Sequence, residues 1–332
     1  MKNKQSTIEQ KISALINELV ESTTQNPKDN SKIDSILDKL HTINTWQIID
    51  PIKSVLDIPE YPIRVKQDLL ALVGKVQDPR AVSLLGSYLE SSNPKLRNMA
   101  IKTLSFIKNP KVTSYLLNVV TNEEDKWTKI FAIHGLTKNT SPKVVQPLVQ
   151  LLGDTEEEVR KEAINALNKI KLDIVDDILI DALNSQNRYI QLGSVSLLGM
   201  RRVKKSTQSL IELLGNEDLR LNLLTCNSLS QISDSESIKS LLEYASNEET
   251  NTNPYILCIQ KMDKKIIPSL IDLYTQAKDD QLISLIEYIL SKRGFETHEE
   301  IINRKLHEKD LEVKEKLQNL LNRIDITSKK QE

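Results

Sequence analysis

The chain has 332 residues, of which 27% are charged and 39% are apolar, and its formal net charge is −1. This balance is typical of a folded water-soluble protein, and it gives no global field that would draw the chain to nucleic acid or to a membrane. The two cysteines and four histidines show no zinc-ligand spacing, and eight glycines are too few to favour a phosphate loop. We therefore expect neither a metal nor a cofactor.

The N-terminal segment 1–24 has the pattern of an amphipathic helix that caps the structure following it. Its apolar positions are interrupted by polar residues such as Glu9, Lys11 and Glu18, so it has no signal-peptide core. No stretch of the chain approaches the roughly 20 apolar residues of a membrane-spanning helix. We expect residues 1–31 to form a capping helix and linker, and we expect a cytoplasmic protein that does not bind membranes.

A repeat of about 31 residues occupies the chain from residue 32 to residue 324. After a weak first copy at 32–40, nine segments share the pattern of VRKEAINAL, and they start at residues 65, 96, 128, 159, 189, 221, 254, 281 and 313. The ninth position of each copy is apolar, and the first, fifth and ninth positions lie on one helical face. The fifth position is small in the middle of the chain, where it is Ala100, Ala132, Ala163, Gly193, Thr225 and Cys258.

A second apolar pattern lies between these segments, as in AVSLLGSYL at 81–89 and VVQPLVQLL at 144–152. Each unit is therefore predicted to be helix–turn–helix, because no stretch alternates with the period of a strand. One such pair cannot bury its own apolar face, whereas stacked neighbours can. The sequence predicts an all-α solenoid of about nine or ten helix pairs over 32–324, with a disordered tail at 325–332.

The repeat resembles the short HEAT-like repeats first associated with phycobilisome lyases. One copy matches the pattern Asp–x(3 or 4)–Val–Arg–x–x–Ala–x–x–x–Leu best, through Asp154, Val159, Arg160, Ala163 and Leu167. The Val73–Gly74 pair is similar to the Leu–Gly helix end of that family. The resemblance implies a right-handed α-solenoid whose concave face is lined by the helices of the Val159 type.

The acidic cluster Asp154–Glu158 raises the question of a metal cage or an acid/base pair. The equivalent loops at 121–126, 215–218 and 246–250 are also acidic. Recurrence at one structural corner favours capping of helix N-termini, whose partial positive charge attracts carboxylates. A catalytic pair would need a pocket with shifted pKa values. We expect Asp154 to cap the helix that begins beside it.

The loops that follow the inner helices are basic and lie along one edge of the predicted array. This basic rim comprises Lys108, Lys111, Lys138, Lys143, Lys169, Lys171, Arg201, Arg202, Lys204 and Lys205. It suits an acidic protein segment or a phosphate backbone, although solubility and helix capping also account for such charges. Aromatic residues interleaved with the lysines are missing from these loops, which argues against base stacking on single-stranded nucleic acid.

The third and seventh positions of the inner helices should face the concave groove. They include Asn98, Lys102, Ile130, His134, Lys161, Asn165, Gln191 and Asn227. This mixture of amide, basic and aliphatic side chains suits an extended peptide or a partner helix, and an ordinary solvated face is the alternative. The spacing forces no orienting carboxylate onto His134, so we assign it no catalytic role. Cys226 and Cys258 are expected to be buried thiols.

These patterns predict a protein-binding scaffold without catalytic residues, in which the concave face holds a partner and the basic rim orients an acidic segment of it. Two alternatives stay open. The repeat subtype implies a phycobilin lyase or a related chromophore-handling factor, and the basic rim implies nucleic-acid binding.

Overall fold

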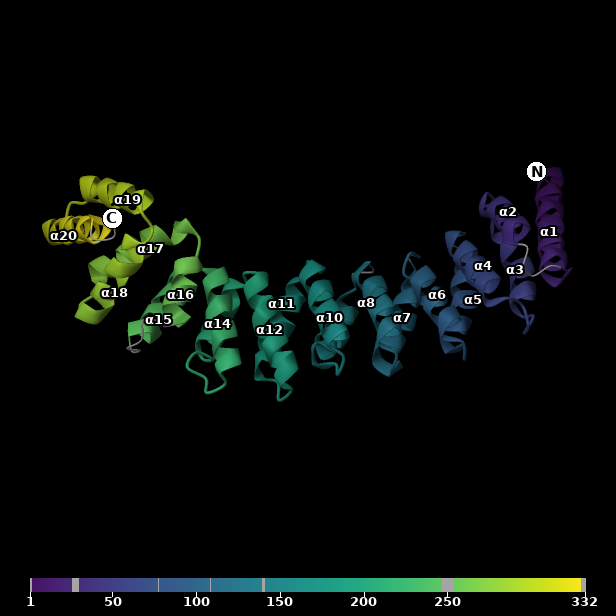
Figure 1. Ribbon diagram of the computed structural model, residues 1–332, viewed down its shortest axis with the longest axis horizontal. Helices are drawn as coiled ribbons and strands as arrows, with labels where there is room; N and C mark the ends of the chain where they lie inside the picture. The colour runs from purple at the N-terminus through teal and green to yellow at the C-terminus, as the bar shows by residue number, and fades with distance from the viewer. Residues whose placement is uncertain are drawn as a thin grey trace. The chain divides into compact units, whose positions relative to one another are not determined.

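The computed structural model describes residues 2–25, 30–76, 78–107, 109–138, 141–246 and 254–329, and over these ranges it contains helices and no strand (Figure 1). The expected all-α fold is confirmed. The chain divides into two compact units, residues 1–174 and 175–332. None of the described helices combines the length and the apolar character that crossing a membrane requires.

The first unit contains ten α-helices within its described ranges. They are α1 (Lys2–Gln25), α2 (Asn30–His41), α3 (Ile49–Leu56), α4 (Ile63–Lys75), α5 (Pro79–Ser87), α6 (Pro94–Leu104), α7 (Pro110–Asn122), α8 (Lys126–Lys138), α9 (Val145–Gln150) and α10 (Glu157–Lys169). Short 3₁₀ turns extend several of them, namely η1 (Trp46–Ile48), η2 (Tyr88–Glu90), η3 (Pro142–Val144) and η4 (Leu151–Gly153).

The second unit continues the same alternation, with α11 starting at the last two residues of the first. Its helices are α11 (Asp173–Asp181), α12 (Arg188–Met200), α13 (Thr207–Ile211), α14 (Leu219–Ile232), α15 (Ser235–Ser246), α16 (Pro254–Lys261), α17 (Ile267–Gln276), α18 (Asp280–Ser291), α19 (Phe295–His307) and α20 (Leu311–Lys329). The 3₁₀ turns are η5 (Ala182–Asn184), η6 (Lys204–Ser206) and η7 (Lys264–Ile266).

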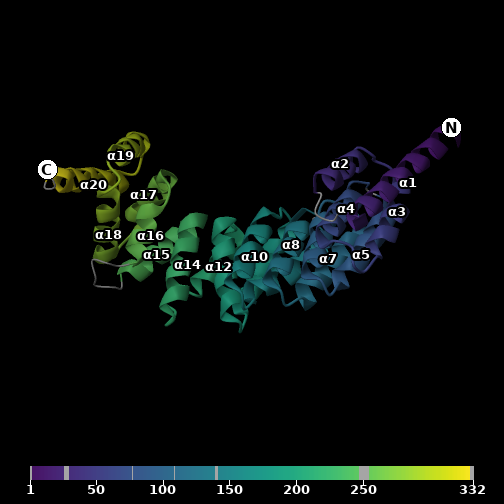
Figure 2. The ribbon, with the colours of Figure 1, turned by 45° about the vertical axis from the view of Figure 1, so that its right-hand side comes forward.

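Helices of each unit pack in two rows (Figure 1 and Figure 2). In the first unit α4, α6, α8 and α10 contact one another in succession, and so do α3, α5, α7 and α9. In the second unit α12, α14, α16, α18 and α20 form one row, and α13, α15, α17 and α19 form the other. We call these the even row and the odd row. The even row consists of the helices predicted to be inner, so each unit is an α-solenoid.

Asx–Pro pairs start three of the helices in the first unit. Asp78–Pro79, Asn93–Pro94 and Asn109–Pro110 each place the proline at the first helical position, where its missing N–H costs no hydrogen bond. In each case the Asx side chain accepts a hydrogen bond from the backbone N–H two residues further on. This satisfies one of the free N–H groups that every helix start exposes.

The helix faces predicted from the repeat are buried. The ninth positions Leu104, Leu136 and Leu167 are fully inaccessible, and so are the fifth positions Ala100 and Ala132. Neither of the two cysteines forms a disulfide, and both are buried, as expected. A hydrogen bond from Cys226 lowers the pKa of Cys258. Small residues at the fifth position therefore let successive even-row helices approach closely, as the repeat columns predicted.

Glycine after the ninth position tightens the contact further. A Cβ atom built on Gly74 of α4 would lie 2.0 Å from Thr103 Cγ2 of α6, and one built on Gly199 of α12 would lie 2.6 Å from Ser228 Cα of α14. No side chain fits at such distances. Glycine at this helix end therefore has a structural cause, because neighbouring repeats approach too closely there to admit a side chain.

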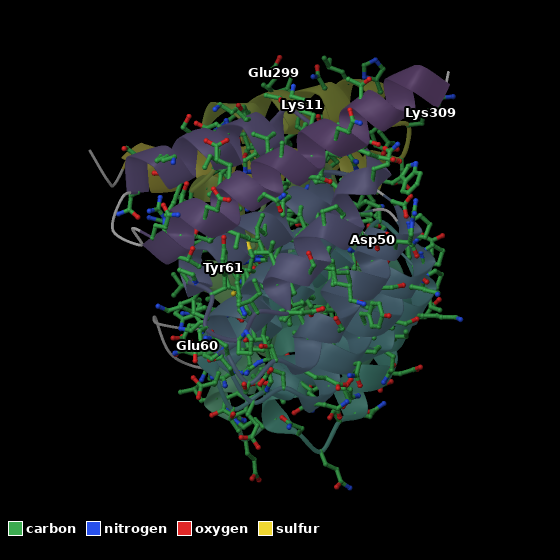
Figure 3. The ribbon with its side chains drawn as sticks, turned by 90° about the vertical axis from the view of Figure 1, so that its right-hand side faces the viewer. Lys11, Asp50, Glu60, Tyr61, Glu299 and Lys309 are labelled. Atoms are coloured by element: carbon green, nitrogen blue, oxygen red, sulfur yellow. The ribbon has the colours of Figure 1, made fainter. Side chains whose placement is uncertain are left out.

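Both ends of the described chain are helical. Helix α1 packs on α2 and α3 through buried residues such as Ile12 and Leu19, and its Thr23 Oγ1 lies 3.0 Å from the hydroxyl of buried Tyr61 (labelled in Figure 3). Helix α20 extends to Lys329, so the helix continues into the segment 325–332 where we expected a disordered tail. Residues 330–332 lie outside the described residues.

Candidate partner-binding surface

The acidic corner before α10 does not cap that helix in the way expected. The residue at the N-cap is Glu156, and its side chain makes no capping hydrogen bond. Asp154 lies two positions earlier, and its Oδ1 accepts from the N–H of Glu156 at 2.9 Å, which holds the loop rather than the helix. Glu157 and Glu158 do lie in the first turn, where the helix dipole favours them. The capping role predicted for Asp154 is therefore wrong.

The same carboxylates tie α10 to α8 of the preceding repeat. Lys129 Nζ lies 2.7 Å from Asp154 Oδ2, and the two side chains are only 15% and 6% exposed. Lys126 Nζ donates to Glu158 Oε1 at 2.8 Å, and this hydrogen bond lowers the pKa of Glu158 and raises that of Lys126. The corner is thus an ion-paired clamp between two even-row helices, which we call the α8–α10 clamp.

Ion pairs between successive repeats recur in both units. Arg64 of α4 pairs with Asp34 of α2 at 2.7 Å, and Arg97 of α6 pairs with Glu123 at 3.4 Å. In the second unit Arg188 pairs with Asp218, and Arg304 pairs with Asp272. Carboxylates of helices and of loops therefore join neighbouring repeats, and their charge is partly neutralised by the cations that they contact.

The predicted basic rim differs between the two units. In the first unit Lys111, Lys138, Lys143, Lys169 and Lys171 are exposed, and none of the described carboxylates lies within ion-pair distance of them. Lys108 lies outside the described residues.

In the second unit acidic residues of α11 neutralise half of the rim. Arg201 Nε lies 2.6 Å from Asp176 Oδ1, and Lys205 Nζ lies 2.5 Å from Asp177 Oδ1. Arg202 and Lys204 are exposed. The positive charge that the sequence predicts at this edge is therefore reduced in the second unit.

Of the residues predicted for the concave face, most are accessible on the even row. In the first unit Lys102, His134, Lys161 and Asn165 are exposed, on α6, α8 and α10. In the second unit Asn227 is exposed on α14. These side chains are accessible to solvent, and their role as partner contacts stays a prediction.

Three of the predicted contact residues serve packing between helices and loops instead. Ile130 is buried, so its predicted role as a surface contact is wrong, and it belongs to the packing between repeats. Asn98 is half-buried and accepts a hydrogen bond from Thr128 of α8 at 2.5 Å. Gln191 is also half-buried, and its Nε2 donates to the carbonyl oxygen of Leu183 at 2.9 Å.

His134 has the carboxylate partner that spacing did not predict. Its Nε2 lies 3.0 Å from Oε2 of Glu162 on α10, and Nδ2 of Asn165 lies 3.5 Å from Oε1 of the same residue. The imidazole is 51% exposed, and in the described residues it makes no hydrogen bond to a Ser, Thr or Cys that could act as a nucleophile. The pair therefore joins two repeats on the accessible face, in the same way as the ion pairs do.

An apolar groove opens between the C-terminal ends of α4 and α6. It has a volume of about 490 Å³ and is lined by Ala71, Gly74, Lys75, Met99, Lys102, Thr103 and Phe106. We call it the α4–α6 groove. Phe106 is 60% exposed, and Lys138 Nζ of α8 lies 3.8 Å from the centroid of its ring. The groove was not predicted from the sequence. The expectation that aromatic residues are missing from the basic loops is wrong, because exposed Phe106 lies beside Lys138.

The lysines around the groove carry uncompensated charge. Lys75 Nζ lies 2.8 Å from Nδ1 of His41, and burial, with Lys75 as a second cause, lowers the pKa of that histidine. The lowered pKa favours the neutral form of His41, which adds neither repulsion nor compensating charge beside Lys75. No described carboxylate lies within ion-pair distance of Lys75, Lys102 or Lys138. The groove is therefore apolar within and cationic at its edge.

The described residues bring together no group of three or more His, Cys, Asp or Glu side chains that could hold a metal ion. The family model for HEAT repeats matches residues 49–129, 113–189 and 176–252, which together span more than half of the chain. The chain is a HEAT-repeat protein. A search of curated proteins finds no match for this HEAT-repeat chain.

Solved structures resemble this HEAT-repeat protein in fold. Kap121p bound to the extreme C-terminus of the protein phosphatase Cdc14p has a TM-score of 0.58 and 14% identity, covering 96% of this chain and 43% of that one. Kap121p bound to Ste12p has a TM-score of 0.58 and 13% identity, covering 96% and 42%. The CpcE–CpcF phycocyanin lyase complex from Nostoc sp. PCC7120 has a TM-score of 0.36 and 15% identity, covering 73% and 94%.

Proposed function

We propose that this HEAT-repeat protein is a non-catalytic scaffold that binds a segment of another protein on the even row of its first unit. The observation that carries the proposal is the line of accessible side chains Lys102, His134, Lys161 and Asn165 on three successive helices. Their hydrogen-bonding ends are presented by packed helices rather than by loops, so little ordering is needed on binding. Lysines of the basic rim would orient an acidic partner.

Relatives in fold support this use of the array. The Kap121p structures hold the C-terminus of Cdc14p and Ste12p, so solenoids of this kind can accommodate segments of other proteins. In such complexes an extended segment or a helix gains affinity from a few anchoring side chains. Lys161 is also paired with Glu157 at 2.6 Å, an exposed contact that a partner carboxylate can replace at small cost.

The experiment is a peptide-display selection on the immobilised full-length chain, followed by calorimetry with the selected peptides. The double variant His134→Ala/Asn165→Ala should weaken binding, because it removes two hydrogen-bonding groups from the even row. The matched variant Asn118→Ala/Gln146→Ala changes exposed positions of the odd row and should leave binding unchanged. Equal loss in both variants, or a selection that yields no binder, would contradict the scaffold function.

The two alternatives make separate predictions. A lyase-like function requires an adduct when the chain is co-expressed with a phycobiliprotein subunit and bilin, and the absence of bilin binding would remove it. Binding of nucleic acid along the basic rim requires a gel shift with steep salt dependence. The pairing of Arg201 and Lys205 with α11 carboxylates counts against the rim of the second unit, so neutralising Arg202 and Lys204 is the sharper test there.

A further inference from the structure

The α4–α6 groove has an apolar interior and a cationic edge. These two features indicate which kind of protein segment it would bind. Its lining comprises Ala71, Gly74, Met99 and Phe106, together with the side chain of Thr103. Methionine and an exposed aromatic ring are adaptable surfaces for a single apolar side chain. A volume of about 490 Å³ accommodates such a side chain together with the backbone that carries it.

Charge on the surrounding helices is strongly asymmetric. Helices α4, α6 and α8 each carry three lysines or arginines, nine in all, and the single carboxylate among them is Asp68. Toward the N-terminal ends of these helices the cations are paired across repeats, through Arg64, Arg97, Lys126 and Lys129. At the C-terminal ends Lys75, Lys102 and Lys138 have no described carboxylate within ion-pair distance.

Helix dipoles account for only part of this placement. Each of the three C-termini carries a partial charge of about −0.5, or roughly −1.5 together, against three lysine charges. The remaining positive charge lies at the edge of the apolar groove, because Lys75 and Lys102 are among its lining residues and Lys138 lies over the ring of Phe106. A segment that complements both the apolar interior and the positive edge has carboxylates on either side of an apolar side chain.

We infer that the α4–α6 groove binds an acidic segment of a partner protein, with a leucine or aromatic side chain inserted beside Phe106 and with flanking Asp or Glu paired to Lys75, Lys102 and Lys138. The inference rests on the scaffold function proposed above and names the partner chemistry of one part of that surface. The anchor supplies affinity by burial of apolar area, and the carboxylates supply orientation.

The probe is a fluorescein-labelled peptide in which a central Leu-Leu pair is flanked on both sides by Asp and Glu, and binding to the full chain is followed by anisotropy. The groove variant is Phe106→Ser/Lys102→Glu. Its matched control is Trp127→Ser/Lys53→Glu, which removes another exposed aromatic side chain and reverses an exposed lysine of α3 that belongs neither to the groove nor to the basic rim. Both variants alter exposed side chains, and circular dichroism verifies that each is folded.

The groove variant should raise the Kd by about tenfold or more, and so should replacement of Leu-Leu by Ser-Ser in the peptide. The control variant should change the Kd by less than about twofold. Equal losses in both variants, or equal binding of the Ser-Ser peptide, would reduce the effect to general charge attraction and overturn the inference. An oligonucleotide that binds with the same dependence on Phe106 would also overturn it, in favour of nucleic acid.

Failure of this inference is distinguishable from failure of the scaffold function. If no acidic peptide binds, the groove inference is lost, while peptides selected by display still test the scaffold. If a selected peptide is lost from His134→Ala/Asn165→Ala but retained by Phe106→Ser/Lys102→Glu, the even row binds partners and the groove does not.

Discussion

Lys129 Nζ of α8 lies 2.7 Å from Asp154 Oδ2, so the carboxylate that introduces one repeat is held by a lysine of the repeat before it. Asp154 also accepts the N–H of Glu156, and Arg160 Nη1 donates to the carbonyl oxygen of Asp154 at 2.6 Å. One loop residue thus links a helix, the loop before it and the neighbouring helix. What resembles a catalytic cluster in the sequence is a structural joint.

Asp154→Ala should lower the free energy of unfolding by about 1–3 kcal/mol, because it leaves the half-buried Lys129 ammonium and the Glu156 N–H without their partner. Urea denaturation followed by circular dichroism measures the change. Glu157→Gln is the control, since the Glu157–Lys161 pair is exposed and should not shift the midpoint. A similar effect of the two substitutions would contradict the α8–α10 clamp.

Gly74→Ala should destabilise the first unit by about 1–3 kcal/mol, because the added Cβ would overlap Thr103 Cγ2. Thr103→Ser removes that methyl group, so the double variant should recover most of the loss. Thermal unfolding of the four proteins in this cycle measures the coupling. Additive effects would mean that the two residues do not meet.

His41 should titrate below its ordinary pKa of 6.5, because burial and then Lys75 lower its pKa, although Asp68 and Asp38 act in the opposite direction. Since the folded pKa lies below the unfolded one, the folded chain binds fewer protons, and this contribution to stability is lost as the pH falls through 6.5 and the folded pKa. Lys75→Met should raise the pKa of His41. Proton NMR of the imidazole measures it, and an unchanged pKa in that variant would contradict the contact.

Tyr274 should ionise well above its ordinary pKa of 10.0. Burial, followed by the neighbouring Glu287, raises its pKa to about 12, and its hydroxyl donates to Glu287 Oε1 at 3.2 Å. The folded state therefore holds the phenolic proton more tightly than the unfolded state, and stability is full below pH 10 and lost as the pH rises toward 12. Tyr274→Phe should remove a step near pH 12 from the tyrosinate absorbance titration. Persistence of that step would assign it to another residue.

Periodicity predicted the buried face of the repeat well, and it did so for a physical reason. Positions such as Ala163 and Leu167 are buried between helices, so apolar residues recur there at a fixed step. The family resemblance also predicted that alternate helices form separate rows, and the contacts between successive even helices and between successive odd helices agree with that prediction.

Contacts between repeats were not predictable in the same way. Asp154 pairs with Lys129, which lies 25 positions earlier in the chain. Whether Asp154 caps α10 or pairs with a residue of α8 depends on the path of the loop that carries it. His134 and Glu162 lie 28 positions apart, and their pairing depends on how α8 and α10 are rotated. Phe106 is exposed because it falls beyond the last turn of α6, where the helical period no longer places it.

The ion pairs between repeats also bear on how the chain folds. Arg64 and Asp34 are separated by 30 residues, and Lys126 and Glu158 by 32, so each bridge forms once two adjacent repeats exist. Low contact order of this kind permits rapid folding, and nearest-neighbour coupling lets structure spread from any pair that forms first. Because each bridge needs only the next repeat, folding can begin during synthesis, before the later repeats have left the ribosome.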